Sequence, residues 1–486
     1  MLKLDDPTLF KQQALIAGEW VDADSGETTQ VTNPATGEVL GTVPMCGTAE
    51  TVRAIEAADI AQRAWRDVPA KERAATLRKL NDLMLANIDD LALILTSEQG
   101  KPLAEAKGEI AYAASFIEWF ADEARRVYGD TIPATSNDKR IVTLKQPVGT
   151  TAAITPWNFP TAMLTRKAGP ALAAGCSMVV KPATQTPFSA FAFAELAQRA
   201  GLPKGLLAVL TGSASAIGGE MTRSPIVRKL SFTGSTEVGR TLMRQSADTI
   251  KKLSLELGGN APFIVFDDAD LDAAASGAMV SKYRNTGQTC VCANRLYVQR
   301  GVLQAFTDKL VAKVKALKVG NGLEAGVTQG PLIDAKAVAK IEEHIADARA
   351  KGAEVLTGGK RHALGGLFFE PTVIGGATAE MKFAHEETFG PLAPIFAFET
   401  EAEVIAAANA TEFGLAAYFY SRDIGRVMRV AEKLEAGMVG INTGLISTAE
   451  APFGGVKQSG LGREGSKYGL DDYLELKYLC FGGIDR

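Results

Sequence analysis

The feature that most constrains this fold is a regular alternation of short apolar runs with amphipathic segments over residues 147–266. Apolar runs of strand length occupy 148–154, 178–181, 206–210 and 229–232, and segments with helical spacing fill the intervals between them. Strands that alternate with helices over so few residues form a parallel sheet with helices on both faces. We therefore predict a doubly wound α/β domain, which binds ligands at the carboxyl ends of its strands.

A second alternating α/β pattern continues from residue 261 to about residue 445, and two segments stand outside both patterns. Residues 131–146 and 473–481 are strand-like and of mixed polarity, and neither follows a helical period. Strands of this kind often form a sheet edge or an arm shared between subunits. With 486 residues the chain is also longer than one hydrophobic core usually organises, so we expect two or three domains.

Composition and charge exclude several classes of partner. The formal net charge is −4, so no basic excess points to nucleic acid or to an anionic membrane. The N-terminus lacks the apolar core and cleavage site of a signal peptide, and Gly and Pro interrupt the apolar stretch 168–180 before it reaches membrane-spanning length. Five Cys with no paired framework fit a reducing compartment, and we predict a cytoplasmic protein.

The scarcity of His directs attention to a thiol. The three His, at 344, 362 and 385, argue against a His-based zinc site and leave few candidates for a Ser-His-Asp triad, so we expect no metal. Cys290 follows a run rich in Asn, Thr and Gly, as in a loop that exposes its side chain. An arbitrary Cys is more often a small buried hydrophobe. That interpretation fits Cys46, Cys176 and Cys480.

A thiol needs a base or a lowered pKa to act as a nucleophile at neutral pH, and no His lies near Cys290 in sequence. Glu256 is a lone acid between two Leu residues, where burial would raise its pKa toward the range of a general base. The common alternative is a surface Glu at a turn. Asn158 follows a buried-type strand, where its amide could donate to an oxyanion together with the backbone N–H of Cys290. As a lone Asn before an aromatic residue, it would more often belong to a turn.

Two strand ends carry residues suited to a dinucleotide. Lys181 ends an apolar strand, where a cation is well placed for a phosphate or a ribose. Gly234 and Ser235 open a predicted helix whose N-terminal N–H groups suit a pyrophosphate. The G-x-x-x-x-G spacing from Gly234 to Gly239 is weak alone, and it lacks the Lys-Ser/Thr pair of a Walker motif.

In combination, six motifs resemble those of aldehyde dehydrogenases and occur in the same order. The likeness extends from residues 18–20 and 33–37 to residues 452–455, which is nearly the whole chain. Six ordered motifs are far more specific than any one of them. They are Pro156-Trp157-Asn158-Phe159-Pro160, Lys181-Pro182-Ala183, Phe232-Thr233-Gly234-Ser235, Glu256-Leu257-Gly258-Gly259, Gly287-Gln288-Thr289-Cys290 and Glu386-Glu387-Thr388-Phe389-Gly390-Pro391.

The resemblance implies an α/β fold with a Rossmann-like cofactor domain, an α/β catalytic domain and a small β oligomerisation arm. The cofactor domain would comprise residues 1–128 and 148–258, and the catalytic domain residues 259–445. Residues 129–147 and 446–486 would supply the oligomerisation and bridging segments. The resemblance also implies a homodimer or a homotetramer.

By the same resemblance, Cys290 is the nucleophile, Glu256 the general base, and Asn158 with the Cys290 amide the oxyanion hole. The thiolate adds to an aldehyde, the thiohemiacetal passes a hydride to the nicotinamide, and water activated by Glu256 hydrolyses the thioester. The implied cofactor contacts are Pro156, Trp157, Lys181, Thr184, Gly234, Ser235, Glu387 and Phe389.

Within the family, residues 163–167, 281–285 and 290–292 resemble succinate-semialdehyde dehydrogenase. That subfamily binds the distal carboxylate of its substrate with side chains that match Arg166, Arg284 and Ser447. Bidentate Arg suits such an anion, and the alternative is that both Arg are helix-surface charges. Glutarate semialdehyde is one methylene longer, and a methylene discriminates by only about 1–3 kcal/mol, so this substrate stays open.

Thr184 and Cys292 carry two further hypotheses. NAD-preferring relatives commonly have Glu at the position of Thr184, which would repel a 2′-phosphate, so we expect NADP to be preferred and NAD to be possible. A disulfide between Cys290 and Cys292 would disable the nucleophile and act as a redox switch, if the loop can reach the required geometry. The alternative is that Cys292 is a spectator.

Three other functions compete with this interpretation. A Cys hydrolase or thioesterase would use Cys290 and Glu256 without redox chemistry, but Lys181, Gly234 and Glu387 speak against it. A CoA-acylating dehydrogenase is closer, although Glu256 favours hydrolytic deacylation. A binding protein without activity is disfavoured because every matched catalytic position is filled.

Overall fold

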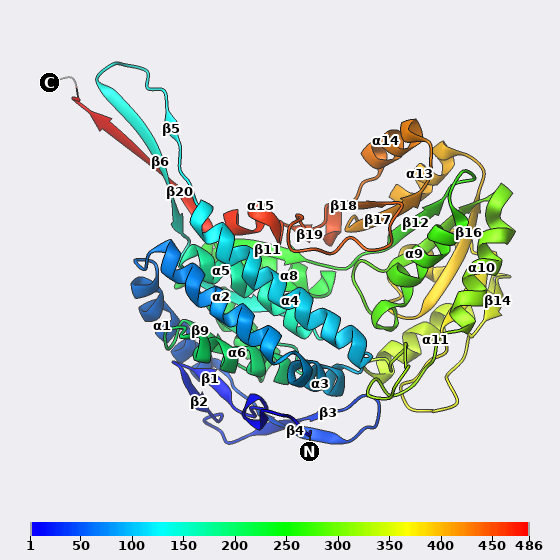
Figure 1. The fold of residues 1–486 in the computed structure, drawn as a ribbon, viewed down its shortest axis with the longest axis horizontal. Helices are drawn as coiled ribbons and strands as arrows, with labels where there is room; N and C mark the ends of the chain where they lie inside the picture. The colour runs from blue at the N-terminus through cyan, green and yellow to red at the C-terminus, as the bar shows by residue number, and fades with distance from the viewer. Residues whose placement is uncertain (1, 485–486) are drawn as a thin grey trace.

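The computed structural model describes residues 2–484 and contains two large sheets side by side, each covered by helices (Figure 1). The first sheet has eight strands in the order β19-β11-β10-β7-β8-β9-β1-β2. The strands from β11 to β9 run parallel, and antiparallel strands close both edges. The strands span Ala14–Ile16 (β1), Glu19–Val21 (β2), Thr150–Ile154 (β7), Ser177–Lys181 (β8), Leu207–Val209 (β9), Val227–Thr233 (β10), Lys252–Glu256 (β11) and Gly460–Leu461 (β19).

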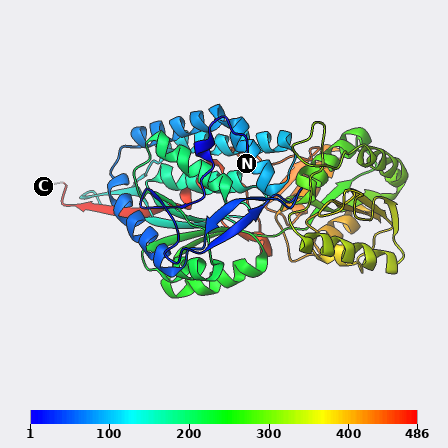
Figure 2. The same ribbon diagram turned by 90° about the horizontal axis from the view of Figure 1, so that it is seen from below.

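Helices cover both faces of this sheet because its strands are apolar on both sides (Figure 2). Successive strand residues point to opposite faces, so Ala153 and Val180 pack with α2–α6, whereas Ala152 and Val179 pack with α1 and α7. The doubly wound prediction is confirmed. The helices span Thr48–Trp65 (α1), Ala70–Ala86 (α2), Ile88–Gln99 (α3), Leu103–Glu123 (α4), Pro160–Ala174 (α5), Phe188–Ala200 (α6), Ala214–Arg223 (α7) and Thr236–Ser246 (α8).

The second sheet has seven strands in the order β14-β15-β16-β13-β12-β17-β18, all parallel except for the β14–β15 pair. Helices α9 and α10 pack on one face, and α11, α13 and α14 on the other. The strands span Ala261–Val265 (β12), Ala293–Gln299 (β13), Glu354–Thr357 (β14), Thr372–Gly375 (β15), Leu392–Phe398 (β16), Ala416–Tyr420 (β17) and Met438–Ile441 (β18). The helices span Leu271–Tyr283 (α9), Leu303–Lys315 (α10), Ala335–Ala350 (α11), Glu401–Asn409 (α13) and Ile424–Lys433 (α14).

A three-stranded arm projects from the first sheet (Figure 1). It consists of β5 (Thr131–Ile132), β6 (Lys139–Pro147) and β20 (Leu474–Gly482), and the last two pair antiparallel along their whole length. The segment 473–481 is therefore a strand as predicted, and the segment 131–146 holds two strands, β5 and β6, with residues 133–138 between them outside any strand. The arm exposes large apolar side chains at Leu476, Tyr478 and Phe481, as expected for a surface that another subunit covers.

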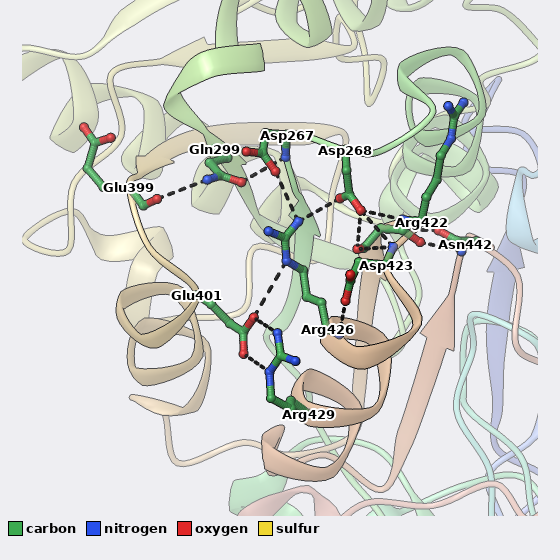
Figure 3. A network of polar contacts seen from close by, with 11 residues as sticks. Asp267, Asp268, Gln299, Glu399, Glu401, Arg422, Asp423, Arg426, Arg429 and Asn442 are labelled. Carbon is green, nitrogen blue, oxygen red and sulfur yellow. Dashed lines mark hydrogen bonds and ion pairs between the residues drawn. The ribbon is translucent and has the colours of Figure 1, made fainter.

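A network of ion pairs ties the second sheet to its outer helices (Figure 3). Asp268, just after β12, accepts hydrogen bonds from the backbone N–H groups of Arg422 and Asp423, both at 2.9 Å. Arg426 of α14 donates to Asp268 at 2.8 Å, and Glu401 at the start of α13 pairs with Arg429. The network fixes the first turns of α13 and α14 against the end of β12.

The first sheet presents the carboxyl ends of its parallel strands at one edge, where the chain also crosses to the second sheet. Strand β7 ends at Ile154, β8 at Lys181, β10 at Thr233 and β11 at Glu256. Residues 257–260 then connect β11 to β12 of the second sheet. A ligand site at this edge can draw residues from both sheets. Among residues 2–484, no helix has both the length and the apolar character that a membrane crossing requires.

Candidate active site

A cavity of about 250 Å³ lies at this edge and gathers most of the residues predicted for the site. Its walls come from the turn after β7, the turn after β10, the end of β11 and the loop after α9. The predicted residues that line it are Pro156, Trp157, Asn158, Arg166, Gly234, Ser235, Glu256, Arg284, Cys290, Glu387, Phe389 and Ser447.

Three predicted residues do not line this cavity. Lys181 is the last residue of β8 and the exposed Thr184 follows it, and β8 neighbours β7 at the same sheet edge. Cys292 is buried, and its thiol donates to the backbone carbonyl of Lys282 at 3.4 Å. Cys290 and Cys292 are both free thiols in this structure.

Cys290 lies outside any strand, as the run of Asn, Thr and Gly before it predicts, and it follows a tight left-handed turn. Asn285 and Thr286 adopt φ values of 51° and 57°. Gly287 has φ 74°, and a Cβ there would lie 2.2 Å from the carbonyl oxygen of Gly390, so only glycine fits. Burial raises the pKa of the Cys290 thiol to about 12, against the opposing effect of the Arg166 charge. The resting group is a neutral thiol that needs a base.

Glu256 is the last residue of β11 and is buried, which replaces the surface-turn alternative. Neither of its carboxylate oxygens has a hydrogen-bond partner among the described residues. Burial, with a contribution from the neighbouring Glu464 carboxylate, raises its pKa well above the ordinary value. A carboxyl group with a raised pKa is a stronger base than an ordinary carboxylate, which suits a general base.

Asn158 directs its amide toward the loop that carries Cys290. Its Nδ2 donates to the backbone carbonyl of Gln288 at 3.1 Å. An amide has two N–H donors, so one remains for an oxygen in the cavity. Asn158 and the Cys290 loop thus face one space from two sides.

Arg166 of α5 is fully buried at the cavity wall, with 1% of its surface exposed. Its Nε lies 2.5 Å from Oε2 of Glu464, and its guanidinium carbon lies 4.0 Å from the ring centroid of Phe453. No nitrogen of the guanidinium has a partner with hydrogen-bond geometry among the described residues. Burial disfavours the charge, but Glu464 and other anions hold the pKa of Arg166 above its ordinary value.

Arg284 and Ser447 line the same cavity, both half-buried. The guanidinium carbon of Arg284 lies 5.3 Å from the ring centroid of Phe159, so this Arg is not a solvated helix-surface charge. The sequence did not single out Tyr112, whose buried hydroxyl has no partner among the described residues and lies at the cavity. A Tyr in an amphipathic helix gives no local signal of such a position.

The residues predicted for a dinucleotide fit that group. Lys181 is buried and makes one long hydrogen bond, 3.3 Å to the carbonyl of Pro182, so two of its donors remain free. Gly234 and Ser235 precede α8, which Ser235 caps. Burial raises the pKa of Glu387 to about 7, although the N–H of Gly259 donates to this carboxylate at 3.2 Å. Among residues 2–484, no group of three His, Cys, Asp or Glu side chains is arranged to hold a metal ion.

A comparison with known protein families decides what this site belongs to. The model of the aldehyde dehydrogenase family matches residues 20–479. This chain belongs to the aldehyde dehydrogenase family. It is therefore an enzyme, and both its fold and its sequence motifs are those of the family. The predicted resemblance is confirmed.

Close relatives and a solved structure agree with this assignment. This aldehyde dehydrogenase is 70% identical over 483 residues to glutarate-semialdehyde dehydrogenase of Pseudomonas aeruginosa, and the alignment covers 99% of this chain and 100% of the relative. It is 67% identical over 481 residues to the NADP(+) succinate-semialdehyde dehydrogenase GabD of Escherichia coli, with 99% and 100% covered. The crystal structure of an E. coli NADP-dependent enzyme, 67% identical, superposes with a TM-score of 0.98 over 99% of this chain and 100% of that one.

Proposed function

We propose that this aldehyde dehydrogenase oxidises succinate semialdehyde to succinate, with NAD(P) as the oxidant. The observation that carries the substrate is the buried Arg166, which lines the same cavity as Cys290. Its Nε pairs with Glu464, but its two terminal nitrogens have no hydrogen-bonded partner among the described residues. A buried cation with free donors favours an anionic group at that point. Arg284 and Ser447 add a second cation and a hydroxyl. The relatives named for succinate and glutarate semialdehyde support the same class of substrate.

The chemistry then uses residues around one cavity. The sulfur of Cys290 bonds to the aldehyde carbon, its proton passes to a base such as Glu256, and the oxygen takes the negative charge. The Asn158 amide and the backbone N–H of Cys290 donate to that oxygen. A bound nicotinamide dinucleotide supplies the acceptor for the hydride that leaves the carbon. Glu256 releases the thiol proton to solvent and then takes a proton from water, whose oxygen attacks the thioester carbon. The C–S bond breaks, the Cys290 sulfur leaves as a thiolate that takes this proton back from Glu256, and the carboxylic acid departs and loses its own proton to solvent.

The direct test measures nicotinamide reduction with succinate semialdehyde, with glutarate semialdehyde, and with and without CoA. Reduction without CoA and release of one carboxylate per cofactor reduced are expected. We expect succinate semialdehyde to have the higher kcat/KM, by up to the roughly 10–200-fold that one methylene can supply. A higher kcat/KM with glutarate semialdehyde would reverse the substrate order. No reduction with any aldehyde would overturn the proposal, and a hydrolase would release acid from thioesters without the cofactor.

For the cofactor we propose a preference for NADP. Thr184 lies exposed after β8, near the buried Lys181, and brings no charge to repel a 2′-phosphate. Replacing it with Glu should lower kcat/KM for NADP and leave that for NAD nearly unchanged. If kcat/KM of the wild-type enzyme with NAD equals or exceeds that with NADP, the proposed preference is wrong.

Three further predictions complete the proposal. The oligomerisation and bridging segments at residues 129–147 and 446–486 should support a homodimer or a homotetramer. The cofactor domain should comprise residues 1–128 and 148–258 and the catalytic domain residues 259–445, and of these ranges residues 1 and 485–486 lie outside the described part of the chain. Residues 460–461 also extend the first sheet, so the bridging segment contacts the cofactor domain. The Cys290–Cys292 switch stays a prediction. It requires oxidative inactivation that dithiothreitol reverses and that Cys292→Ala abolishes.

A further inference from the structure

The corner between α3 and α4 contacts the active-site turns from outside the cavity. Lys101, in the connection between the two helices, and Glu109 of α4 are buried, with exposures of 2% and 3%. Neither lines the cavity. Burying a Lys and a Glu costs free energy unless both are paired and hydrogen-bonded. The partners of Lys101 and Glu109 are therefore the segments that this buried pair connects.

The ammonium of Lys101 contacts the turn that carries Asn158. Its Nζ lies 2.5 Å from Oε2 of Glu109 and donates to the backbone carbonyl of Asn158 at 2.8 Å. It also lies 3.8 Å from the ring centroid of Phe159. Asn158 and Phe159 both line the cavity, so one buried cation contacts two consecutive residues of its wall.

Glu109 extends the same contact to the helix that carries Arg166. Its Oε1 accepts hydrogen bonds from the N–H groups of Thr161 and Ala162, at 3.1 and 3.2 Å. Both residues lie in the first turn of α5, which begins at Pro160, and a carboxylate is favourable there because the N-terminal end of the helix dipole is positive. Glu109 therefore fixes the start of α5 relative to Lys101.

The loop that carries Cys290 is attached to the same carbonyl. Nδ2 of Asn285 donates to the backbone carbonyl of Asn158 at 3.0 Å and to that of Gln288 at 3.1 Å. Gln99, at the end of α3, donates to Oδ1 of Asn285 at 2.9 Å. The left-handed backbone at Asn285 persists only where its surroundings hold it. The α3–α4 corner thus holds the Asn158 turn and the Cys290 loop together.

We propose that Lys101 is a positioning residue for the aldehyde oxidation proposed above, on which this inference rests. Its ammonium, held by Glu109, sets the Asn158 turn against the Cys290 loop, so that the amide and the thiol meet at one substrate carbonyl. A displacement of about 1 Å in such an arrangement costs on the order of 10²-fold in rate. Lys101 acts through Asn158, and its loss should lower kcat rather than weaken substrate binding.

The test is a double-mutant cycle between Lys101→Met and Asn158→Ala, with kcat, KM and the cofactor Kd measured for each enzyme. Lys101→Met alone should lower kcat by about 10- to 100-fold, with KM and Kd within threefold of the wild type. In the Asn158→Ala background the same change should cost less than threefold, because the group that Lys101 positions is already absent. Independent, additive losses would overturn the proposal, as would a Lys101→Met enzyme with more than half of the wild-type kcat.

Lys251 provides the matched control. It is also buried, and its ammonium donates to the backbone carbonyls of Met221, Ser224 and Val227, none of which lines the cavity. Lys251→Met should lower the melting temperature without changing kcat. An equal loss of kcat in both Lys variants would show a general packing effect and would overturn the positioning role.

Glu109→Gln keeps the test available if Lys101→Met does not fold. It removes the charge that holds the ammonium and keeps an acceptor for α5. We expect a smaller loss of kcat with the same non-additivity toward Asn158→Ala, and additive losses would again overturn the proposal. A wild-type enzyme inactive on every aldehyde would instead overturn the proposed function, so the two failures are distinct.

Discussion

Two clusters of Arg and carboxylate groups in this protein behave in opposite ways. In the surface network around Arg426, Glu401 is partly exposed to solvent, and hydrogen bonds from Arg429 lower its pKa (Figure 3). At the cavity, Glu256 lies within reach of the charge of Arg166 and yet has a raised pKa, because burial outweighs the attraction. The same residue types thus give a carboxylate with a lowered pKa in one place and a carboxyl group with a raised pKa in the other.

Glu401 and Glu256 differ in their exposure to solvent and in the number of hydrogen bonds that their oxygens accept. Glu401 satisfies its oxygens with Arg429 at 2.8 and 2.9 Å, and water screens the pair. Neither oxygen of Glu256 and neither terminal nitrogen of Arg166 has a hydrogen-bond partner among the described residues, although the Nε of Arg166 pairs with Glu464. Buried groups left without partners are costly, and such groups collect where a substrate is expected to supply the partner.

The largest effect is expected from Glu256→Gln. An amide cannot take a proton from water, so kcat should fall by about 10²- to 10⁴-fold. The wild-type rate should rise with pH as the raised pKa of Glu256 is passed, and the variant should lack that rise. Steady-state rates across pH check both. The matched change Glu401→Gln should leave kcat unaltered, and a Glu256→Gln rate within tenfold of the wild type would contradict the assignment.

Arg166→Met should weaken recognition of the substrate carboxylate. Removing one partner of a buried charge pair typically costs 2–5 kcal/mol, so KM for succinate semialdehyde should rise by roughly 10²-fold. Butanal has four carbons and no carboxylate, and its kcat/KM should change by less than threefold. Equal losses with both aldehydes would mean that Arg166 serves its pairing with Glu464 and not the substrate.

Glu387 should make cofactor binding depend on pH. In the folded protein its pKa is raised to about 7, so the carboxyl is mostly protonated below pH 7 and ionised above it. An ionised acceptor binds ribose hydroxyls better, and affinity should therefore rise by about tenfold from pH 6 to pH 8 and then level off. Fluorescence titration of the cofactor measures this. The rise should vanish in Glu387→Gln, and a rise that persists there belongs to another group.

Arg426→Met should have the smallest effect and so sharpens the contrast. Half-exposed ion pairs contribute about 0–1 kcal/mol each, so the free energy of unfolding should fall by about 1–2 kcal/mol with three carboxylate partners involved. Denaturant titration checks the loss, and kcat and KM should stay at wild-type values. A change in KM comparable with that of Arg166→Met would show that the two clusters are not independent.

Much of the fold was predictable because its signals are local. The alternation over residues 147–266 predicted the parallel strands from β7 to β10, since each strand and helix buries its own apolar face. Strand order was not predictable. That β7 lies between β8 and β10, and that residues 460–461 return to pair with β11, depends on contacts between segments far apart in the chain.

The sequence by itself singled out the side chains to which we assign the proposed chemistry, and only the tertiary structure decided the surroundings of those side chains. Cys290, Glu256 and Asn158 stand out because a residue's chemistry and its immediate neighbours are local properties. The pairing of Arg166 with Glu464 and the hold of Lys101 on Asn158 bring together residues from distant segments. Burial sets the pKa values and the unpartnered donors of this site, and burial is a property of the packed chain rather than of any stretch of it.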